Sequence, residues 1–309
     1  SSMLNCLFYK KTMEGPGTGE PPKGVKTVVS MDPIREERWR WLNLETWEWD
    51  DFQKPIPFLP VYIAVNTSCA TFCNDCIYIL GGRDEKDGIQ QWCWTLPLGT
   101  REWQRGPDLT GKRAKMCSIA LNNKIYSIGG IDGAEKDVRT VEVLDLSAAT
   151  KQWKQIASMN HVRKFAACTV FGGCIYVFGG SDGEPLNTAE KYDPQTDTWT
   201  IISSMTVARF SAAVGVYGNK IYVAGGLNIG QGVFQSVVEV YDPETDSWDE
   251  GPELCMERFE GTLFIHQGQL AMAGGSACPA EVLDKESNTW ELKLSNDSPK
   301  YSAIYFAIY

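Results

Sequence analysis

Histidine is nearly absent from the 309-residue sequence, which contains only His161 and His266. Acid–base and nucleophilic catalysis most often place a histidine beside a serine, cysteine or carboxylate, and neither histidine lies in such a motif. A Walker A sequence is also missing, and the Gly-Gly doublets described below are not followed by predicted helices, as a nucleotide-binding fingerprint requires. The sequence therefore favours a protein that is not an enzyme and has no cofactor.

Long apolar runs and excess positive charge are missing as well. No stretch reaches the roughly 18 apolar residues of a membrane-spanning helix. The first residues, SSMLNCLFYKK, lack the apolar core and the small-residue cleavage site of a secretory signal peptide. The formal net charge is −10 at pH 7, which argues against binding nucleic acid over a broad surface. We expect a protein without nucleic-acid or membrane partners.

Cysteine is plentiful, with ten residues, but a chain of this length forms a core without disulfides. Most of the cysteines lie in predicted strands, and we interpret them as thiols of a reducing compartment, the cytoplasm or alternatively the nucleus. Cys69, Cys73 and Cys76 have the spacing of a radical-SAM iron–sulfur motif. Because they would lie on two strands rather than in a loop that converges on one point, we expect no cluster and no metal there.

A repeat with a period near fifty organises the chain. The first members of five Gly-Gly doublets are 48, 50, 46 and 49 residues apart. A tryptophan follows each doublet and a sixth, Trp49, precedes the first, each with a hydroxyl residue three positions before it. The doublets start at Gly81, Gly129, Gly179, Gly225 and Gly274, and the tryptophans are Trp49, Trp103, Trp153, Trp199, Trp248 and Trp290. Six such units of four strands predict an all-β, six-bladed β-propeller.

The two ends of the chain complement each other in this repeat. The first unit lacks an innermost strand, and the C-terminal segment 300–309, KYSAIYFAIY, has no unit of its own. We expect this segment to complete the first blade and so remove two open sheet edges. The predicted propeller spans residues 25–309. Residues 1–24, with the Gly/Pro-rich stretch EGPGTGEPPKG, are interpreted as a tag remnant, a linker or a mobile N-terminal segment.

The doublets, the tryptophans and the loop sequences IASMNHVRK, SSMTVAR and PELCMER resemble Kelch repeats, and more narrowly the Kelch half of BTB-Kelch proteins. The resemblance covers roughly residues 25–309. It implies a substrate adaptor of a cullin–RING ubiquitin ligase, in which a BTB domain outside this chain contacts the cullin. It also implies that a short degron segment binds one face of the propeller.

Basic residues recur sixteen positions before the doublets, where the sequence has Arg113, Arg163, Arg209 and Arg258. Val65 breaks the pattern, and the aligned C-terminal strand places Lys300 there. Propeller symmetry predicts a ring of these residues around the channel mouth. One interpretation is a site for an acidic segment, because guanidinium groups grip carboxylates. In the other, each arginine holds its own loop through carbonyl groups or an acid such as Glu257 or Glu260.

Neighbouring side chains extend the candidate partner-binding site. The next positions hold Phe210, Phe259 and Tyr301, which would either form apolar sub-pockets or plug the channel. His161 lies in the loop of Arg163 and is a further candidate contact. The resemblance matches arginines at these positions to contacts with acidic side chains of degrons.

We therefore expect a protein-interaction domain that recognises a short acidic or mixed segment. One alternative is a scaffold that binds actin filaments through the sides of its blades, as some Kelch proteins do. Another is an enzyme on a Kelch scaffold. Galactose-oxidase-like copper sites use paired tyrosines and histidines, and the two isolated histidines of this sequence fit such a site poorly.

Overall fold

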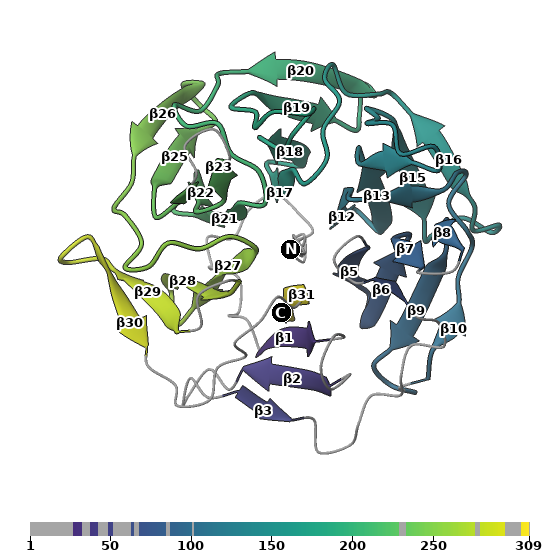
Figure 1. Cartoon of the computed structure of the whole chain (residues 1–309), viewed down its shortest axis with the longest axis horizontal. Helices are drawn as coiled ribbons and strands as arrows, with labels where there is room; N and C mark the ends of the chain where they lie inside the picture. Colours follow the sequence, from purple (N-terminus) through teal and green to yellow (C-terminus); the bar gives the residue numbers. More distant parts are fainter. Residues whose placement is uncertain are drawn as a thin grey trace.

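The computed structural model describes residues 27–32, 38–42, 49–51, 63–64, 68–84, 87–100, 102–228, 233–275, 279–293 and 304–308. Strands, turns and loops make up these ranges, and no helix within them is long and apolar enough to cross a membrane. Four-stranded antiparallel sheets are arranged around a central axis (Figure 1). The protein is an all-β β-propeller.

Five blades follow one another along the chain, and each is named here by its innermost strand. Their strands run from the axis outwards in sequence order. The β5 blade contains β5 (Cys69–Cys73), β6 (Cys76–Leu80), β9 (Cys93–Pro97) and β10 (Gln104–Arg105). The β12 blade contains β12 (Cys117–Leu121), β13 (Lys124–Ile128), β15 (Val141–Asp145) and β16 (Trp153–Ile156). The β17 blade contains β17 (Ala167–Phe171), β18 (Cys174–Phe178), β19 (Ala189–Asp193) and β20 (Thr198–Ile202). The β21 blade contains β21 (Ala213–Tyr217), β22 (Lys220–Ala224), β25 (Val238–Asp242) and β26 (Ser247–Glu250). The β27 blade contains β27 (Gly261–His266), β28 (Gln269–Gly274), β29 (Ala280–Asp284) and β30 (Thr289–Lys293).

A further four-stranded sheet joins the two ends of the chain. It contains β1 (Thr27–Asp32), β2 (Arg38–Leu42), β3 (Trp49–Asp51) and the C-terminal β31 (Ile304–Ile308). β31 pairs antiparallel with β1, so that Met31 lies opposite Ile304, and it also contacts β5 and β27. The predicted closure of the first blade by the C-terminal segment is confirmed by this pairing. The predicted boundary between residues 24 and 25 lies outside the described residues.

Two-residue turns join the two innermost strands of each contiguous blade, as the sequence predicts. Asn74 and Asp75 have φ angles of 51° and 54°, in the left-handed region that such tight hairpins require. The equivalent pairs also have positive φ and are Asn122-Asn123, Gly172-Gly173, Gly218-Asn219 and Gln267-Gly268. Residues that tolerate this conformation therefore set the register of the inner hairpins.

The glycine doublets lie where one blade meets the next. A Cβ atom on Gly225 would lie 2.3 Å from the carbonyl oxygen of Arg258, which belongs to the following blade. The amide of Gly226 donates a hydrogen bond of 2.8 Å to that same oxygen. Corresponding contacts join Gly81 and Gly82 to Arg113, Gly129 and Gly130 to Arg163, and Gly179 and Gly180 to Arg209. These positions require glycine because any side chain would displace the adjacent blade.

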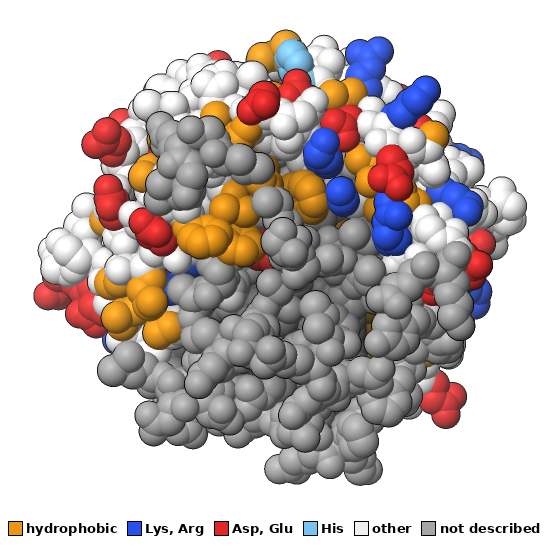
Figure 2. Space-filling model, in the orientation of Figure 1, with side chains coloured by type: hydrophobic (Ala, Val, Ile, Leu, Met, Phe, Trp, Pro, Cys, Tyr) orange, Lys and Arg blue, Asp and Glu red, His pale blue; other side chains and the backbone are white. Residues whose placement is uncertain are grey.

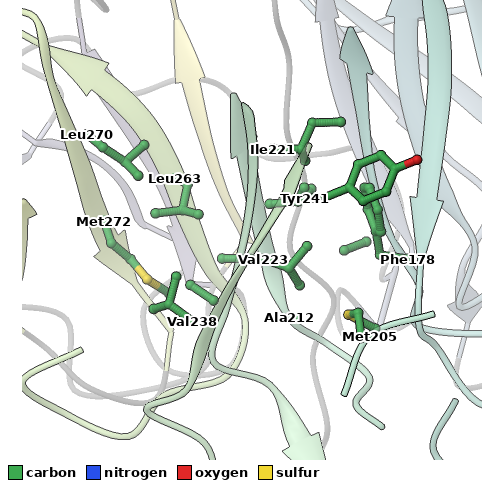
Figure 3. Close-up of a cluster of buried hydrophobic side chains, with 14 of the residues drawn as sticks. Phe178, Met205, Ala212, Ile221, Val223, Val238, Tyr241, Leu263, Leu270 and Met272 are labelled. Atoms are coloured by element: carbon green, nitrogen blue, oxygen red, sulfur yellow. The ribbon is translucent and has the colours of Figure 1, made fainter. Parts of the chain in front are cut away.

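Apolar side chains fill the space between adjacent blades. Phe178, Val223 and Leu263 come from three successive blades and belong to one buried cluster (Figure 3). The repeated tryptophans add hydrogen bonds, because each Nε1 donates to a carbonyl oxygen in the loop that leads into its own blade. These bonds are 2.8 to 2.9 Å long and join Trp153 to Pro107, Trp199 to Ala157, Trp248 to Ser203 and Trp290 to Pro252. The tryptophans thus hold the connections between blades.

Candidate functional site: the loop face

Two sets of loops meet at one end of the propeller. The connection that enters a blade pairs with the loop after the glycine doublet of the same blade. β11 (Arg113–Ala114) pairs with β14 (Ile131–Asp132), and single bridges join Lys164 to Ser181 and Phe210 to Leu227. Further short strands of these loops are β4 (Ile63–Ala64), β7 (Arg83–Asp84), β8 (Gly88–Ile89), β23 (Leu227–Asn228) and β24 (Val233–Phe234). We call this end the loop face.

The four repeated arginines lie beneath this face and are at most 5% exposed. Arg209 is an example. Its Nη1 atom donates to the carbonyl oxygens of Gly225 and Val237 at 3.0 and 2.8 Å, and its Nη2 atom lies 2.6 Å from Oε2 of Glu239. The other three make the same set of contacts: Arg113 with Gly129, Thr140 and Glu142, Arg163 with Gly179, Thr188 and Glu190, and Arg258 with Gly274, Pro279 and Glu281.

Each arginine also joins two blades. The backbone oxygen of Arg209 accepts a hydrogen bond of 3.0 Å from Gly180 in the preceding blade, while its guanidinium group binds the doublet of its own blade. Burial lowers the pKa of the Arg209 guanidinium from its usual value, and the charge of Glu239 acts in the opposite direction. A buried charge pair of this kind is stable only when its remaining donors and acceptors are satisfied, which the carbonyl contacts provide.

This geometry corrects the expectation that Arg113, Arg163, Arg209 and Arg258 contact an acidic ligand. The guanidinium groups are sealed inside the protein and bound to protein oxygens. They hold the entering loops, as the second interpretation proposed, but the paired acids are on the third strand of each blade. The carboxylates of Glu142, Glu190, Glu239 and Glu281 also accept backbone amide bonds from the loops, from Thr110, Asn160, Thr206 and Cys255 respectively.

The glutamates carry a sequence signal that the arginine pattern alone does not show. Each lies opposite the residue two positions before its glycine doublet, as Glu142 lies opposite Ser127. In the β5 blade the same register position is Trp94, opposite Ile79. The entering loop of that blade has Val65 in place of arginine. Arginine and glutamate are therefore absent together from one unit, as expected of a structural pair.

Two positions after each arginine, the backbone forms an arc around the axis. Lys115, Phe165, Ser211 and Glu260 have φ angles between 53° and 63°. The backbone amides of Phe165, Ser211 and Glu260 each donate a hydrogen bond to the carbonyl oxygen of the preceding residue in this series. All three hydrogen bonds are 2.9 Å long. We call these four residues the axial rim. The predicted convergence of loops from successive blades is thus correct, but of the four rim residues Lys115 alone is half-buried and the others are buried.

Side chains on the loop face divide into a cationic part and an aromatic part. Figure 2 shows lysine and arginine side chains on one side of this face, with hydrophobic side chains beside them. Phe210 is buried against Phe165 and Leu227, in the manner of a plug. Phe259 is half-buried and stacks on Phe234 with 5.0 Å between ring centroids. Phe234 is 45% exposed, so this end of the aromatic cluster offers an apolar surface.

The remaining predicted contacts have different outcomes. The side chain of His161 is exposed, and its backbone amide donates to Oε1 of Glu190 at 3.1 Å. Lys300 and Tyr301 lie outside the described residues. No interaction of these three residues with a partner is tested by the structure.

The cysteines singled out by their spacing are buried thiols. Cys73 and Cys76 lie opposite each other in the β5–β6 hairpin, with Cys69 at the far end of β5. Burial raises the pKa of both Cys73 and Cys76 to about 11, so both are protonated at neutral pH. Within the described ranges, no group of three or more His, Cys, Asp or Glu side chains is arranged to hold a metal ion.

Comparisons with known proteins agree with this architecture. The family described as "KLHDC2/KLHL20/DRC7 Kelch-repeats domain" matches residues 30–208, and the Kelch motif matches residues 208–254. The chain is 28% identical over 188 residues to a Kelch repeat and BTB domain-containing protein of Caenorhabditis elegans, covering 58% of this chain and 29% of that protein. It is 30% identical over 177 residues to mouse Kelch-like protein 35, covering 57% and 27% of the two chains. It is 38% identical over 199 residues to a putative F-box/kelch-repeat protein of Arabidopsis thaliana, covering 63% and 45%.

The solved structure of YjhT has a TM-score of 0.68 against this chain, with 13% identity, and covers 89% of this chain and 99% of that one. This likeness concerns the fold alone. The chain spans less than half of the length of the three curated relatives described above. The family match covers more than half of the chain, and the glycine doublets, tryptophans and closed ring of blades agree with it. The chain belongs to the Kelch-repeat family, whose propellers bind protein partners.

Proposed function

We propose that this Kelch domain recognises a short segment of a partner protein at its loop face, without catalysing a reaction. We further propose that it does so in the cytoplasm or nucleus, as the substrate receptor of a cullin–RING ubiquitin ligase adaptor. The observation that carries the recognition role is the axial rim, because backbone hydrogen bonds bring loops of successive blades together there. Because the rim brings these loops together, exposed side chains of different loops, such as Phe234, can contact one peptide at the same time.

The adaptor role is supported by the relatives. One of them is named as a protein with both Kelch repeats and a BTB domain, and others are Kelch-like proteins. In such an arrangement the BTB domain contacts the cullin and the propeller presents the substrate. This chain matches only part of those proteins, and the proposed role assigns the cullin contact to a domain outside it.

Immunoprecipitation of the complete protein from cells tests this role, with two exposed apolar residues as matched variants. Phe234 lies on the loop face, whereas Ile201 lies on the outermost strand β20 and is 53% exposed. We expect wild type and Ile201→Ser to recover the same protein together with a cullin, and ubiquitination of that protein to require the adaptor. Phe234→Ser should retain the cullin and lose the substrate. Equal recovery and ubiquitination of the substrate with Phe234→Ser would contradict recognition at the loop face.

The blade sides favour a second candidate, a scaffold that binds actin filaments. Ile201 on β20 and Leu292 on β30 are 53% and 41% exposed, and both lie on outermost strands. Cosedimentation with filamentous actin tests this function. The scaffold predicts binding that Ile201→Ser or Leu292→Ser weakens and that Phe234→Ser leaves unchanged. Absence of cosedimentation at micromolar filament concentrations would contradict it.

A further inference from the structure

Lys115 is the one cation of the axial rim, and its ammonium group is held close to the aromatic cluster. The side chain is half-buried, and its Nζ atom lies 5.3 Å from the ring centroid of Phe165. Within the described part of the chain, no hydrogen bond or ion pair joins this ammonium group to another residue. A cation held over an aromatic face has lost some of its hydration. An added anion therefore stabilises it more than it would stabilise a fully hydrated cation.

The acids nearest to Lys115 are already engaged by other cations. Glu135 lies 2.6 Å from Arg83, and both carboxylate oxygens of Asp137 accept hydrogen bonds of 2.8 Å from Lys164. Burial lowers the pKa of Lys115 from its usual value, and the charges of Lys164 and Arg83 lower it further. Glu135 and Asp137 oppose this effect without reversing it. An incoming carboxylate would stabilise the charged form of Lys115, which burial and the two neighbouring cations disfavour.

A chain of aromatic contacts, in which Phe165 and Phe210 are buried, links this cation to the exposed ring of Phe234. The ring of Phe165 lies 5.9 Å from that of Phe210, and Phe259 packs against the same cluster. Phe259 stacks at 12° on Phe234, the exposed end of these contacts. These aromatic side chains come from the entering loops of three successive blades and from β24. Exposed apolar surface such as that of Phe234 is typical of a protein-interaction site.

We propose that the partner segment bound at the loop face carries one acidic side chain, anchored by Lys115, and within a few residues an aromatic or large aliphatic side chain that packs on Phe234 and Phe259. This inference rests on the proposed recognition function. A single lysine presents a compact point charge without the planar fork of arginine, which suits one carboxylate. The net charge of −10 disfavours a nucleic acid as the occupant.

Selection from a phage-displayed library of random twelve-residue peptides tests this specificity, with the folded chain as bait. The variants are Lys115→Gln, Lys115→Arg and Phe234→Ser. Lys285→Gln is the matched control, because Lys285 makes the same kind of contact, 5.1 Å from the ring centroid of Tyr217, and Tyr217 ends β21 at the opposite end of its blade. Unchanged thermal unfolding of each variant establishes that it is folded.

We expect wild type, Lys115→Arg and Lys285→Gln to select peptides with an acidic residue near an aromatic or large aliphatic one. Lys115→Gln should bind a synthetic peptide from the wild-type selection about tenfold more weakly, as loss of one partly buried charge contact implies. Replacement of the acidic residue by its amide should weaken wild type equally and Lys115→Gln little. Phe234→Ser should lose the apolar preference.

Two results would overturn the inference, and they differ in what they leave standing. Selected peptides that depend on Phe234 but bind Lys115→Gln and wild type equally would refute the acidic anchor and preserve recognition at the loop face. Selected peptides whose binding neither Lys115→Gln nor Phe234→Ser weakens would refute both the anchor and the proposed function.

Discussion

The arginines and the axial rim are two positions apart in sequence, yet they have opposite roles. Arg113, Arg163, Arg209 and Arg258 are buried, and each makes the same bonds to a doublet carbonyl, a loop carbonyl and a glutamate. The rim positions hold a lysine, a phenylalanine, a serine and a glutamate. In both sets the backbone conformation recurs from one unit to the next. The side chain recurs at the arginine positions and varies at the rim positions.

The difference separates structure from specificity within each repeat. A residue that recurs in every unit with the same partners performs a task that every unit needs, here the joining of adjacent blades. A position whose backbone recurs but whose side chain changes is free to serve recognition. The comparison therefore assigns the buried arginines to the fold and agrees with the proposed ligand contacts at Lys115 and Phe234.

Loss of one buried arginine should have the largest effect. Arg163→Met leaves the carboxylate of Glu190 buried without its cation, and we expect a loss of about 3–5 kcal/mol in the free energy of unfolding. Urea denaturation measures this effect. Arg139→Met is the control, because Arg139 is exposed, and it should change stability by less than about 0.5 kcal/mol. Equal stability of the two variants would remove the distinction between buried and exposed arginines.

Substitution of a doublet glycine should come next. In Gly225→Ala, the added Cβ meets the Arg258 carbonyl at 2.3 Å and the residue keeps a φ of +66°, so we expect a cost above about 2 kcal/mol. Gly172→Ala provides the control, because Gly172 has a φ of +56° with no atom within 4 Å of its added Cβ. Thermal unfolding should show a clearly larger decrease for Gly225→Ala. A decrease of the same size in both would mean that conformation, and not the adjacent blade, fixes the doublet.

A repeated tryptophan should contribute less. Trp199→Phe removes the 2.9 Å hydrogen bond from Nε1 to the carbonyl oxygen of Ala157, at an expected cost of about 1 kcal/mol in unfolding free energy. Trp94 offers a comparison, because its Nε1 atom is buried and has no hydrogen-bond partner among the residues that the structure describes. Trp94→Phe should therefore be nearly neutral in the same denaturation experiment. A larger loss from Trp94→Phe would contradict the role assigned to the loop contact.

An exposed residue of the aromatic cluster should have the smallest effect on stability. Phe234→Ser replaces a side chain that is 45% exposed, and we expect the unfolding free energy to change by at most about 0.5 kcal/mol. Binding of a selected peptide, measured by fluorescence polarisation, should weaken all the same. A Phe234→Ser variant that unfolds early would show that this surface belongs to the fold.

Much of the fold can be predicted from the sequence, because each repeat needs particular residues at the same backbone positions. The doublets, the positive-φ turns and the surplus C-terminal strand each have a local chemical signature, and the structure confirms all three. The ring of arginine positions was also predictable. The burial of these arginines does not follow from the repeat, because the paired glutamates lie 23 to 30 residues away, as Arg258 and Glu281 or Arg209 and Glu239 show. Because the loops differ in length, the spacing between arginine and glutamate differs from unit to unit. A pattern of fixed period therefore does not reveal the pairing.

The candidate site was harder to predict, for a related reason. Lys115 and Phe165 occupy one repeated backbone position with unlike side chains, so no periodic pattern marks them. Their significance depends on the cation–aromatic distance of 5.3 Å between different blades. Phe234 lies in the loop after a doublet and joins the cluster only through its stacking on Phe259. Contacts of this kind require the three-dimensional arrangement.

A double-mutant cycle on Arg209 and Glu239 tests the central claim most directly. Urea unfolding is measured for wild type, Arg209→Met, Glu239→Gln and the double variant. Because each single change leaves one buried group without its partner, we expect the double variant to be more stable than the sum of the single losses by at least about 1 kcal/mol. Single variants that unfold at the wild-type urea concentration but no longer bind the selected peptide would contradict the account, because the arginine would then serve the ligand and not the fold.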